Sequence, residues 1–84
     1  MENCYYRNYE ELTVDLHNMN VWDAWNYLDR FIEMAPKGIN EIVVIHGYNN
    51  GTSLMNMVRT KYKNKRISKK YASWNEGRTS LILS

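Results

Sequence analysis

The sequence predicts an α/β fold, more specifically a two-layer α+β sandwich with a mixed four-stranded sheet and the element order β-α-β-α-β-β. Three observations predict it. An alternating strand pattern over residues 11–17 precedes a long amphipathic helix pattern, a β-branched run follows that helix, and two more strand patterns close the chain. The 84 residues, 44% of them hydrophobic, suffice for one domain with a modest core.

The first strand pattern follows residues 1–10, which show no clear period and which we interpret as an N-terminal arm. We place the domain itself at residues 11–84. Leu12, Val14 and Leu16 alternate with polar residues, as is typical of a strand with one buried face.

A helix is expected to begin after Asn20, because Asn is a favoured N-cap residue and Asp23 follows three positions later, as in a capping box. Pro36 and Gly38 predict its end. The apolar residues between them recur at helical spacing and form one stripe: Val21, Ala24, Trp25, Leu28, Ile32 and Ala35, widened by Phe31.

The β-branched run "EIVVIH" at residues 41–46 predicts a central parallel strand that is buried on both faces. A helix between two such strands fits a right-handed crossover. We expect a second helix capped by Thr52 or Ser53, a third strand within residues 66–74, and an antiparallel closing strand at 78–84. The inner face of that second helix is expected to comprise Leu54, Met57, Val58 and Tyr62.

Both histidines of the chain follow a predicted parallel strand. Asp15 and His17 lie at the end of the first strand, and His46 lies at the end of the second. Ligands of open α/β sheets bind beyond the carboxyl ends of parallel strands, so we expect these three residues to share one edge. Imidazole exchanges protons near neutral pH, and a carboxylate can orient it or bind a divalent ion. Asp15, His17 and His46 are therefore candidate catalytic residues, with Asp15 a possible ligand for Mg²⁺ or Mn²⁺.

The loop after His46 has the composition of a phosphate site. Glycines allow close approach of the backbone to a ligand, and a helix start offers unpaired N–H groups. The same residues are also ordinary turn formers, so a plain turn remains an alternative. The candidate phosphate or nucleic-acid ligands are Gly47, Tyr48, Asn49, Asn50, Gly51 and Thr52, with Tyr48 the aromatic best placed to stack on a base.

Charge is distributed unevenly along the chain. Residues 1–45 carry a net charge of −5 and residues 46–84 a net charge of +7. This asymmetry indicates a polyanionic partner, although a solvated helix end and edge strand would give the same pattern. The candidates for contact with a nucleic-acid backbone are Lys65, Arg66, Lys69 and Lys70.

Two short motifs resemble those of the small MutS-related domain, the Smr domain. Residues 14–17, "VDLH", are similar to its L-D-x-H motif, and residues 46–49, "HGYN", are similar to its H-G-x-G motif. The resemblance covers residues 11–84. Asn18 stands where that family commonly has a glycine, and Asn49 replaces the second glycine of the second motif.

The resemblance implies a fold similar to the C-terminal domain of bacterial translation initiation factor 3. It also implies nucleic-acid binding and, as in several members of the family, endonuclease or nicking activity on DNA or RNA. Three functions therefore remain open. The chain is a small nuclease that uses Asp15, His17 and His46, a nucleic-acid-binding module without chemistry, or a protein-interaction module that uses Trp22, Trp74 and the N-terminal tyrosines.

The location and assembly of the chain are expected from composition alone. The start of the sequence lacks the pattern of a secretory signal, and no apolar run has the length of a membrane span. Cys4 is the single cysteine, so it forms no internal disulfide, and a reducing cytoplasm is the expected location. We expect a monomer, with the oligomeric state left open by the sequence.

Overall fold

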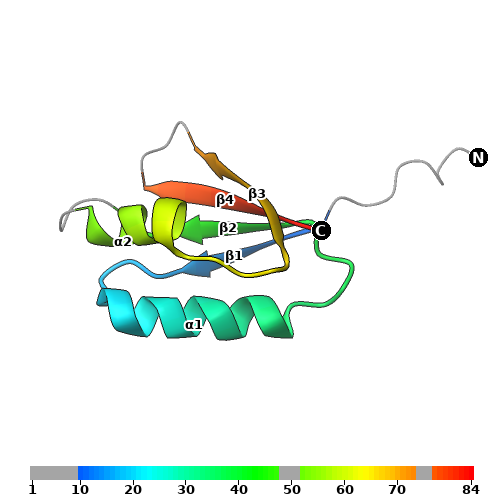
Figure 1. Cartoon of the computed structure of the whole chain (residues 1–84), viewed down its shortest axis with the longest axis horizontal. Coiled ribbons are helices and arrows are strands. Elements are labelled where there is room, and N and C mark those ends of the chain that lie inside the picture. The colour runs from blue at the N-terminus through cyan, green and yellow to red at the C-terminus, as the bar shows by residue number, and fades with distance from the viewer. Residues whose placement is uncertain (1–9, 48–51, 74–76) are drawn as a thin grey trace, which may run out of the picture.

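The computed structural model describes residues 10–47, 52–73 and 77–84; the predicted arm up to residue 9 and Trp74 lie outside this part. The elements are β1 (Glu11–Asp15), α1 (Val21–Met34), β2 (Glu41–Ile45), α2 (Ser53–Asn56), η2 (Met57–Lys61), β3 (Ile67–Ala72) and β4 (Arg78–Leu83). Their order confirms the predicted one, with the second helix divided in two (Figure 1). No helix in the described part has the length and apolarity needed to cross a membrane.

The sheet is mixed and four-stranded, with the spatial order β1-β2-β4-β3. β1 and β2 are parallel, with Asp15 opposite Ile45, and β4 is antiparallel to both of its neighbours. The carboxyl ends of β1 and β2 therefore meet the start of β4, where Arg78 lies opposite Ile45. This edge of the sheet is the one that carries the three predicted catalytic residues, Asp15, His17 and His46.

The helix α1 begins as the capping pattern predicts. The Asn20 side-chain oxygen accepts a hydrogen bond from the Asp23 N–H at 2.8 Å, and the Asn20 amide donates to the Asp23 carboxylate at 3.1 Å. The predicted buried stripe includes Val21, but this residue is 37% exposed, so the buried part of the stripe begins one turn later, at Ala24. Trp25 is only partly buried and meets Tyr62 edge to face, with ring centroids 5.1 Å apart.

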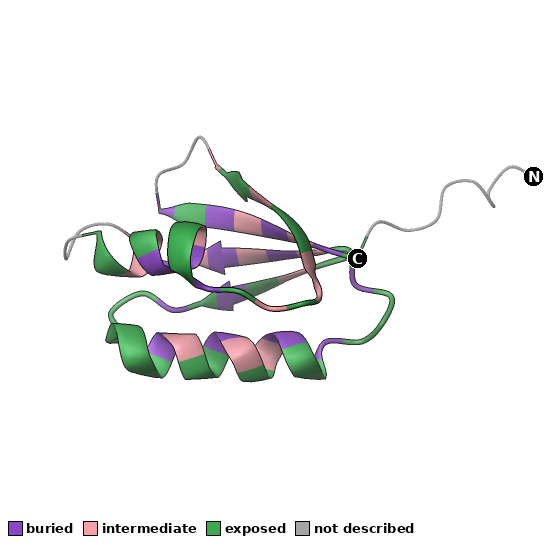
Figure 2. Ribbon diagram, in the orientation of Figure 1, coloured by how far each residue is buried: buried purple, intermediate pink, exposed green. Residues whose placement is uncertain are grey.

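The helices cover only one face of the sheet. Ile42 and Val44 are buried, whereas Val43 and Ile45, which alternate with them, are only partly buried (Figure 2). The expectation that β2 is buried on both faces is therefore wrong. The buried residues of the other strands lie on the same side as Ile42 and Val44, because the core is a single cluster that includes both helices. We call the side of the sheet that none of the described helices covers the open face.

The second helix is one α-helical turn followed by a π-helical turn. The Tyr62 N–H donates to the Met57 carbonyl at 2.7 Å, a five-residue step that widens the last turn. Met57, Val58 and Tyr62 are buried, which confirms most of the predicted inner face, and Leu54 is partly buried. Thr52 occupies the N-cap position, but its side chain makes no capping hydrogen bond.

Candidate functional site

Asp15 and His17 form a hydrogen-bonded pair at the end of β1. The Asp15 Oδ1 atom accepts from the His17 backbone N–H at 3.0 Å and lies 2.5 Å from the His17 Nδ1 atom. The side chains are 53% and 55% exposed, respectively. The hydrogen bonds from the His17 ring and backbone lower the pKa of Asp15, so its carboxylate is ionised at neutral pH and can orient the imidazole. This arrangement holds Nδ1 and leaves Nε2 without a hydrogen-bond partner among the described residues.

The turn after His17 depends on a left-handed residue. Asn18 has a φ of 71°, and the Met19 N–H donates to the Leu16 carbonyl at 3.1 Å. Asn tolerates this conformation better than most residues, and glycine tolerates it best. The left-handed backbone therefore accounts for an Asn at this position.

His46 is buried, with 3% of its surface exposed, and both ring nitrogens are engaged. Its Nε2 atom lies 2.8 Å from the Thr79 hydroxyl oxygen, and its Nδ1 atom lies 3.0 Å from the Gly47 carbonyl oxygen. Arg59 Nε donates to the same Thr79 hydroxyl at 2.7 Å. Because the Gly47 carbonyl oxygen only accepts, Nδ1 carries the proton and donates to it. In the neutral ring Nε2 then accepts from the Thr79 hydroxyl, which itself accepts from Arg59.

Burial is also the main reason that the pKa of His46 is lowered, with the nearby charge of Arg59 acting in the same direction and the bond to Gly47 opposing both. The ring is therefore neutral at neutral pH, and it holds the end of β2 against β4. This position is that of a structural histidine in a buried network.

The three predicted catalytic residues share an edge but do not form one cluster. Asp15 alternates with buried Val14 and Leu16, so it points to the open face, whereas His46 continues the buried side of β2. The structure thus brings His17 together with Asp15 and places His46 on the opposite side of the sheet. The sequence located the edge correctly, but side-chain alternation separates its residues.

Gly47 connects the two motifs through its backbone. Its φ is 72°, and a Cβ atom built on it would lie 3.4 Å from the His17 Cβ. The N–H groups of His46 and Gly47 both donate to the Gly77 carbonyl, at 2.9 Å and 3.0 Å. The remaining predicted loop ligands, Tyr48, Asn49, Asn50 and Gly51, lie outside the described residues, and Thr52 is exposed. The phosphate loop stays a prediction.

Two of the four predicted basic contacts are used inside the fold. Arg66 Nη1 donates to the carbonyls of Ile32, at 2.6 Å, and Ala35, at 3.0 Å, at the C-terminus of α1. Lys70 Nζ donates to the carbonyls of Val58 and Tyr62, and burial lowers its pKa.

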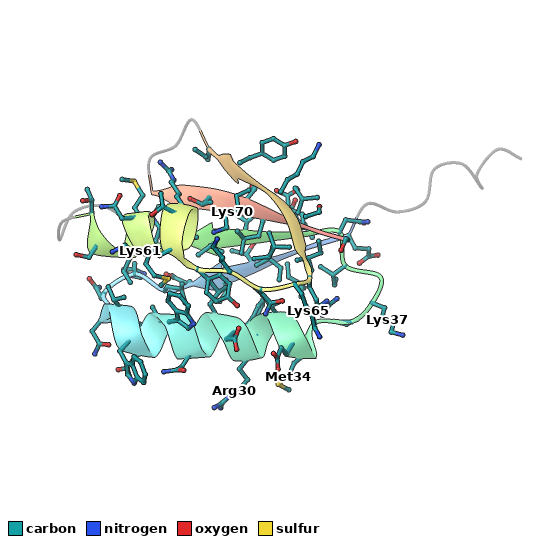
Figure 3. The ribbon with its side chains drawn as sticks, in the orientation of Figure 1. Arg30, Met34, Lys37, Lys61, Lys65 and Lys70 are labelled. Carbon is teal, nitrogen blue, oxygen red and sulfur yellow. The ribbon has the colours of Figure 1, made fainter. Side chains whose placement is uncertain are left out.

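Lys65 and Lys69 are exposed. Figure 3 shows Lys70 reaching from β3 toward the helical layer, whereas Lys65 lies near the C-terminal end of α1. Lys65 and Arg66 directly precede β3, whose first residue, Ile67, pairs with Leu83 at the end of β4. Asp15 lies in the row of Arg78, at the start of β4, so these two basic residues and Asp15 lie at opposite ends of the sheet. Arg66 and Lys70 are therefore helix-capping residues in this fold, a role that the charge pattern does not reveal.

Arg59, Thr79 and Arg78 were not singled out from the sequence, although they lie at the site edge. Arg59 also donates through Nη2 to the Arg78 carbonyl at 2.9 Å. The sequence holds one sign that Thr79 is buried, because Thr79, Leu81 and Leu83 occupy every second position of β4, and both leucines are buried. A hydroxyl at such a position needs a polar partner, and here His46 and Arg59 are its partners.

Metal binding would depend on few protein ligands. Among the residues that the structure describes, no three His, Cys, Asp or Glu side chains cluster as a metal site. Asp15 Oδ1 takes both bonds from His17, so Oδ2 is the oxygen that remains for a cation. Mg²⁺ commonly binds through one or two carboxylates and completes its shell with water and substrate phosphates, which this single oxygen fits.

Comparisons with known proteins agree with the motifs. The family model described as the Smr domain matches residues 14–82. The crystal structure of the Smr domain of Thermus thermophilus MutS2 is similar to this fold, with a TM-score of 0.76 and 23% sequence identity over 86% of this chain and 96% of that one. The comparison with curated proteins found no match. The similarity to translation initiation factor 3 stays a prediction.

Proposed function

Because the chain belongs to the Smr domain family, we propose that it binds nucleic acid and acts as an endonuclease that nicks DNA or RNA by phosphodiester hydrolysis. The observation that carries this proposal is the exposed Asp15–His17 pair at the carboxyl edge of the parallel strands. An ionised carboxylate that holds one nitrogen of an exposed imidazole is a common arrangement for general acid–base catalysis.

The roles of the residues follow from their positions. Asp15 orients the His17 ring through Nδ1, and Nε2 takes a proton from the attacking water or gives one to the leaving oxygen. Gly47 keeps the space beside His17 free of a side chain. His46 supports the backbone of this edge through Thr79 and Gly47, and it exchanges no proton with the substrate in this proposal.

A divalent ion, if the reaction uses one, would be held by Asp15 Oδ2 and the substrate phosphate. Bound there, Mg²⁺ or Mn²⁺ would supply neutralisation of phosphate charge. Comparison of activity in Mg²⁺, in Mn²⁺ and in chelator is therefore part of the test.

The test is a nicking assay on supercoiled plasmid, run beside cleavage of a structured RNA. The variants are Asp15→Asn and His17→Ala, with Glu11→Gln as the control because Glu11 is an exposed carboxylate on the same strand and face. We expect both site variants to lose about 100-fold or more in rate with unchanged unfolding curves. Parent-like cleavage by His17→Ala would refute the catalytic role of the pair.

A binding module without chemistry is the second candidate, and the basic C-terminal half favours it. Residues 46–84 carry a net charge of +7, and Lys65 and Lys69 are exposed. Its signature is binding without cleavage, with an affinity that falls steeply as salt rises. Binding by the parent and by His17→Ala, with no cleavage by either, would select this candidate.

A further inference from the structure

The open face of the sheet carries a group of side chains that the fold does not use. Arg78 and Ser80 alternate with the buried Thr79 and Leu81 on β4, so they point to the open face. On β3, Lys70 reaches the helical layer, so its neighbours Lys69 and Tyr71 point the other way. Tyr71 lies opposite Ser80. We call Lys69, Tyr71, Arg78 and Ser80 the open-face strip.

Three members of the strip have no structural task within the described part of the chain. The side chains of Lys69, Tyr71 and Arg78 make no ion pair or hydrogen bond there, and Tyr71 is 52% exposed. The contrast is with Arg66 and Lys70, whose charged groups cap helices. Two free cations that flank an exposed aromatic ring make a surface suited to a ligand with both phosphates and flat rings.

The strip leads to the candidate catalytic pair. Asp15 lies opposite Ile45, and Ile45 lies opposite Arg78, so the three residues form one row across the sheet. Neighbouring strands are about 4.8 Å apart, which places Asp15 and Arg78 about 10 Å from each other on the same face. A polymeric ligand that lies along the strip therefore reaches Asp15 and His17 without crossing to the helical side of the sheet.

We propose that the open-face strip binds an unpaired stretch of nucleic acid, with one base stacked on Tyr71 and the adjoining phosphates held by Lys69 and Arg78. This inference rests on the proposed function and names its substrate as single-stranded. An unpaired base exposes the ring face that Tyr71 needs, whereas the bases of a duplex are stacked on each other. Other four-stranded sheets bind single strands through aromatic residues in the same way.

The experiment measures the binding of a labelled oligonucleotide of about 12 nucleotides by fluorescence anisotropy, in chelator, and a denaturing gel run afterwards checks that the probe is still intact. Three probes of one base sequence are used, namely single-stranded RNA, single-stranded DNA and the DNA duplex. The variants are Tyr71→Ala and Tyr71→Phe. Tyr27→Ala is the matched control, because Tyr27 is an exposed tyrosine (47%) on α1, away from the strip.

We expect Tyr71→Ala to weaken single-strand binding about tenfold, and Tyr71→Phe and Tyr27→Ala to change it less than about twofold, because stacking needs the ring and not the hydroxyl. Lys69→Ala and Arg78→Ala should each reduce the slope of affinity against salt by about one phosphate contact, and Lys37→Ala should not.

Two results would overturn the inference while leaving the proposed function standing. One is parent-like single-strand binding by Tyr71→Ala, and the other is tighter binding of the duplex than of either single strand. If the parent binds none of the three probes and also cuts no nucleic acid, the proposed function fails together with the inference. The RNA and DNA arms show which of the two single strands is preferred.

Discussion

The backbone of Gly47 lies directly against the side chain of His17. A Cβ atom added to Gly47 would come within 3.4 Å of the His17 Cβ, and the φ of Gly47 is 72°, a value that L side chains rarely adopt. The close approach joins the end of β2 to the end of β1. It also places the His17 side chain beside the backbone of a residue that has no side chain.

Gly47→Ala should therefore weaken both the fold and the site. The left-handed backbone costs a residue with a Cβ about 1–2 kcal/mol. Gly38→Ala is the control, since nothing lies within 4 Å of its added Cβ. Urea unfolding should show the loss for Gly47→Ala only. Equal stability of the two variants would contradict the conformation described for Gly47.

Asn18 offers a second test of a left-handed position. We expect Asn18→Ala to lower the free energy of unfolding by about 1 kcal/mol, because its φ of 71° disfavours a residue with a nonpolar Cβ. Asn18→Gly should retain more stability than Asn18→Ala, because glycine adopts this φ without strain. The comparison uses urea unfolding of the three proteins. A less stable glycine variant would show that the side chain of Asn18 matters more than its backbone.

Thr79 joins two charged or polar partners in the buried network, so its removal should be costly. Thr79→Val keeps the shape but leaves His46 Nε2 and Arg59 Nε without their shared partner. A buried polar group without a partner costs about 1–3 kcal/mol, and Thr79→Ser should recover most of it. Chemical denaturation checks the expected order, in which valine is least stable. Equal stability of the valine and serine variants would mean that the hydroxyl is not required.

The basic residues of the C-terminal half should separate into two classes. Arg66→Ala is expected to destabilise the protein by about 1–3 kcal/mol, because it caps the carbonyls of Ile32 and Ala35. Lys65→Ala removes the neighbouring exposed charge and should leave the free energy of unfolding within about 0.5 kcal/mol. Thermal unfolding of the two variants makes the comparison. A parent-like Arg66→Ala protein would show that its hydrogen bonds contribute no net stability.

The elements of this fold were predictable because each depends on the spacing of apolar and capping residues that are close together in the sequence. The stripe of α1 from Ala24 onward, the cap at Asn20 and the alternation in β1 depend on near neighbours in the sequence, and all three appear in the structure. The open face was not predicted, because a β-branched strand looks the same whether one or two layers cover it. The position of Val43 and Ile45 depends on where both helices pack, which local pattern does not state.

The candidate site was predictable only as an edge. The order of elements places His17 and His46 at the same ends of neighbouring strands. Which face of the sheet each side chain lies on depends on which alternate residues of its strand face the core, and this puts the two histidines on opposite faces. Arg66 and Lys70 could not be separated from Lys65 and Lys69 by charge, since their roles depend on carbonyls from remote helices. A single sequence does not show which residues that are distant along the chain become partners in the fold.

The buried state of His46 predicts a specific dependence of stability on pH. Burial lowers its pKa from the usual 6.5, so below that pH the unfolded chain binds a proton that the folded chain refuses. The free energy of unfolding should therefore fall as pH drops below about 6.5, by at most about 1.4 kcal/mol per pH unit, and stop falling below the folded-state pKa. Urea unfolding from pH 8 to pH 5 measures this slope.

The control for this dependence is His46→Gln, which carries no titrating ring. The lowered pKa of Asp15 stabilises the folded state fully above the ordinary pKa of that carboxyl, and this contribution is lost only in more acidic solution, so Asp15 should leave the interval from pH 8 to pH 5 largely unaffected. The variant is thus expected to be less stable than the parent at pH 8 but to lose less stability on acidification. Ring NMR signals supply an independent reading, in which His46 of the folded parent takes up its proton at a lower pH than an imidazole with the ordinary pKa. A His46 ring that titrates at or above its ordinary pKa in the folded parent, or identical slopes for both proteins, would show that another group controls the acid response.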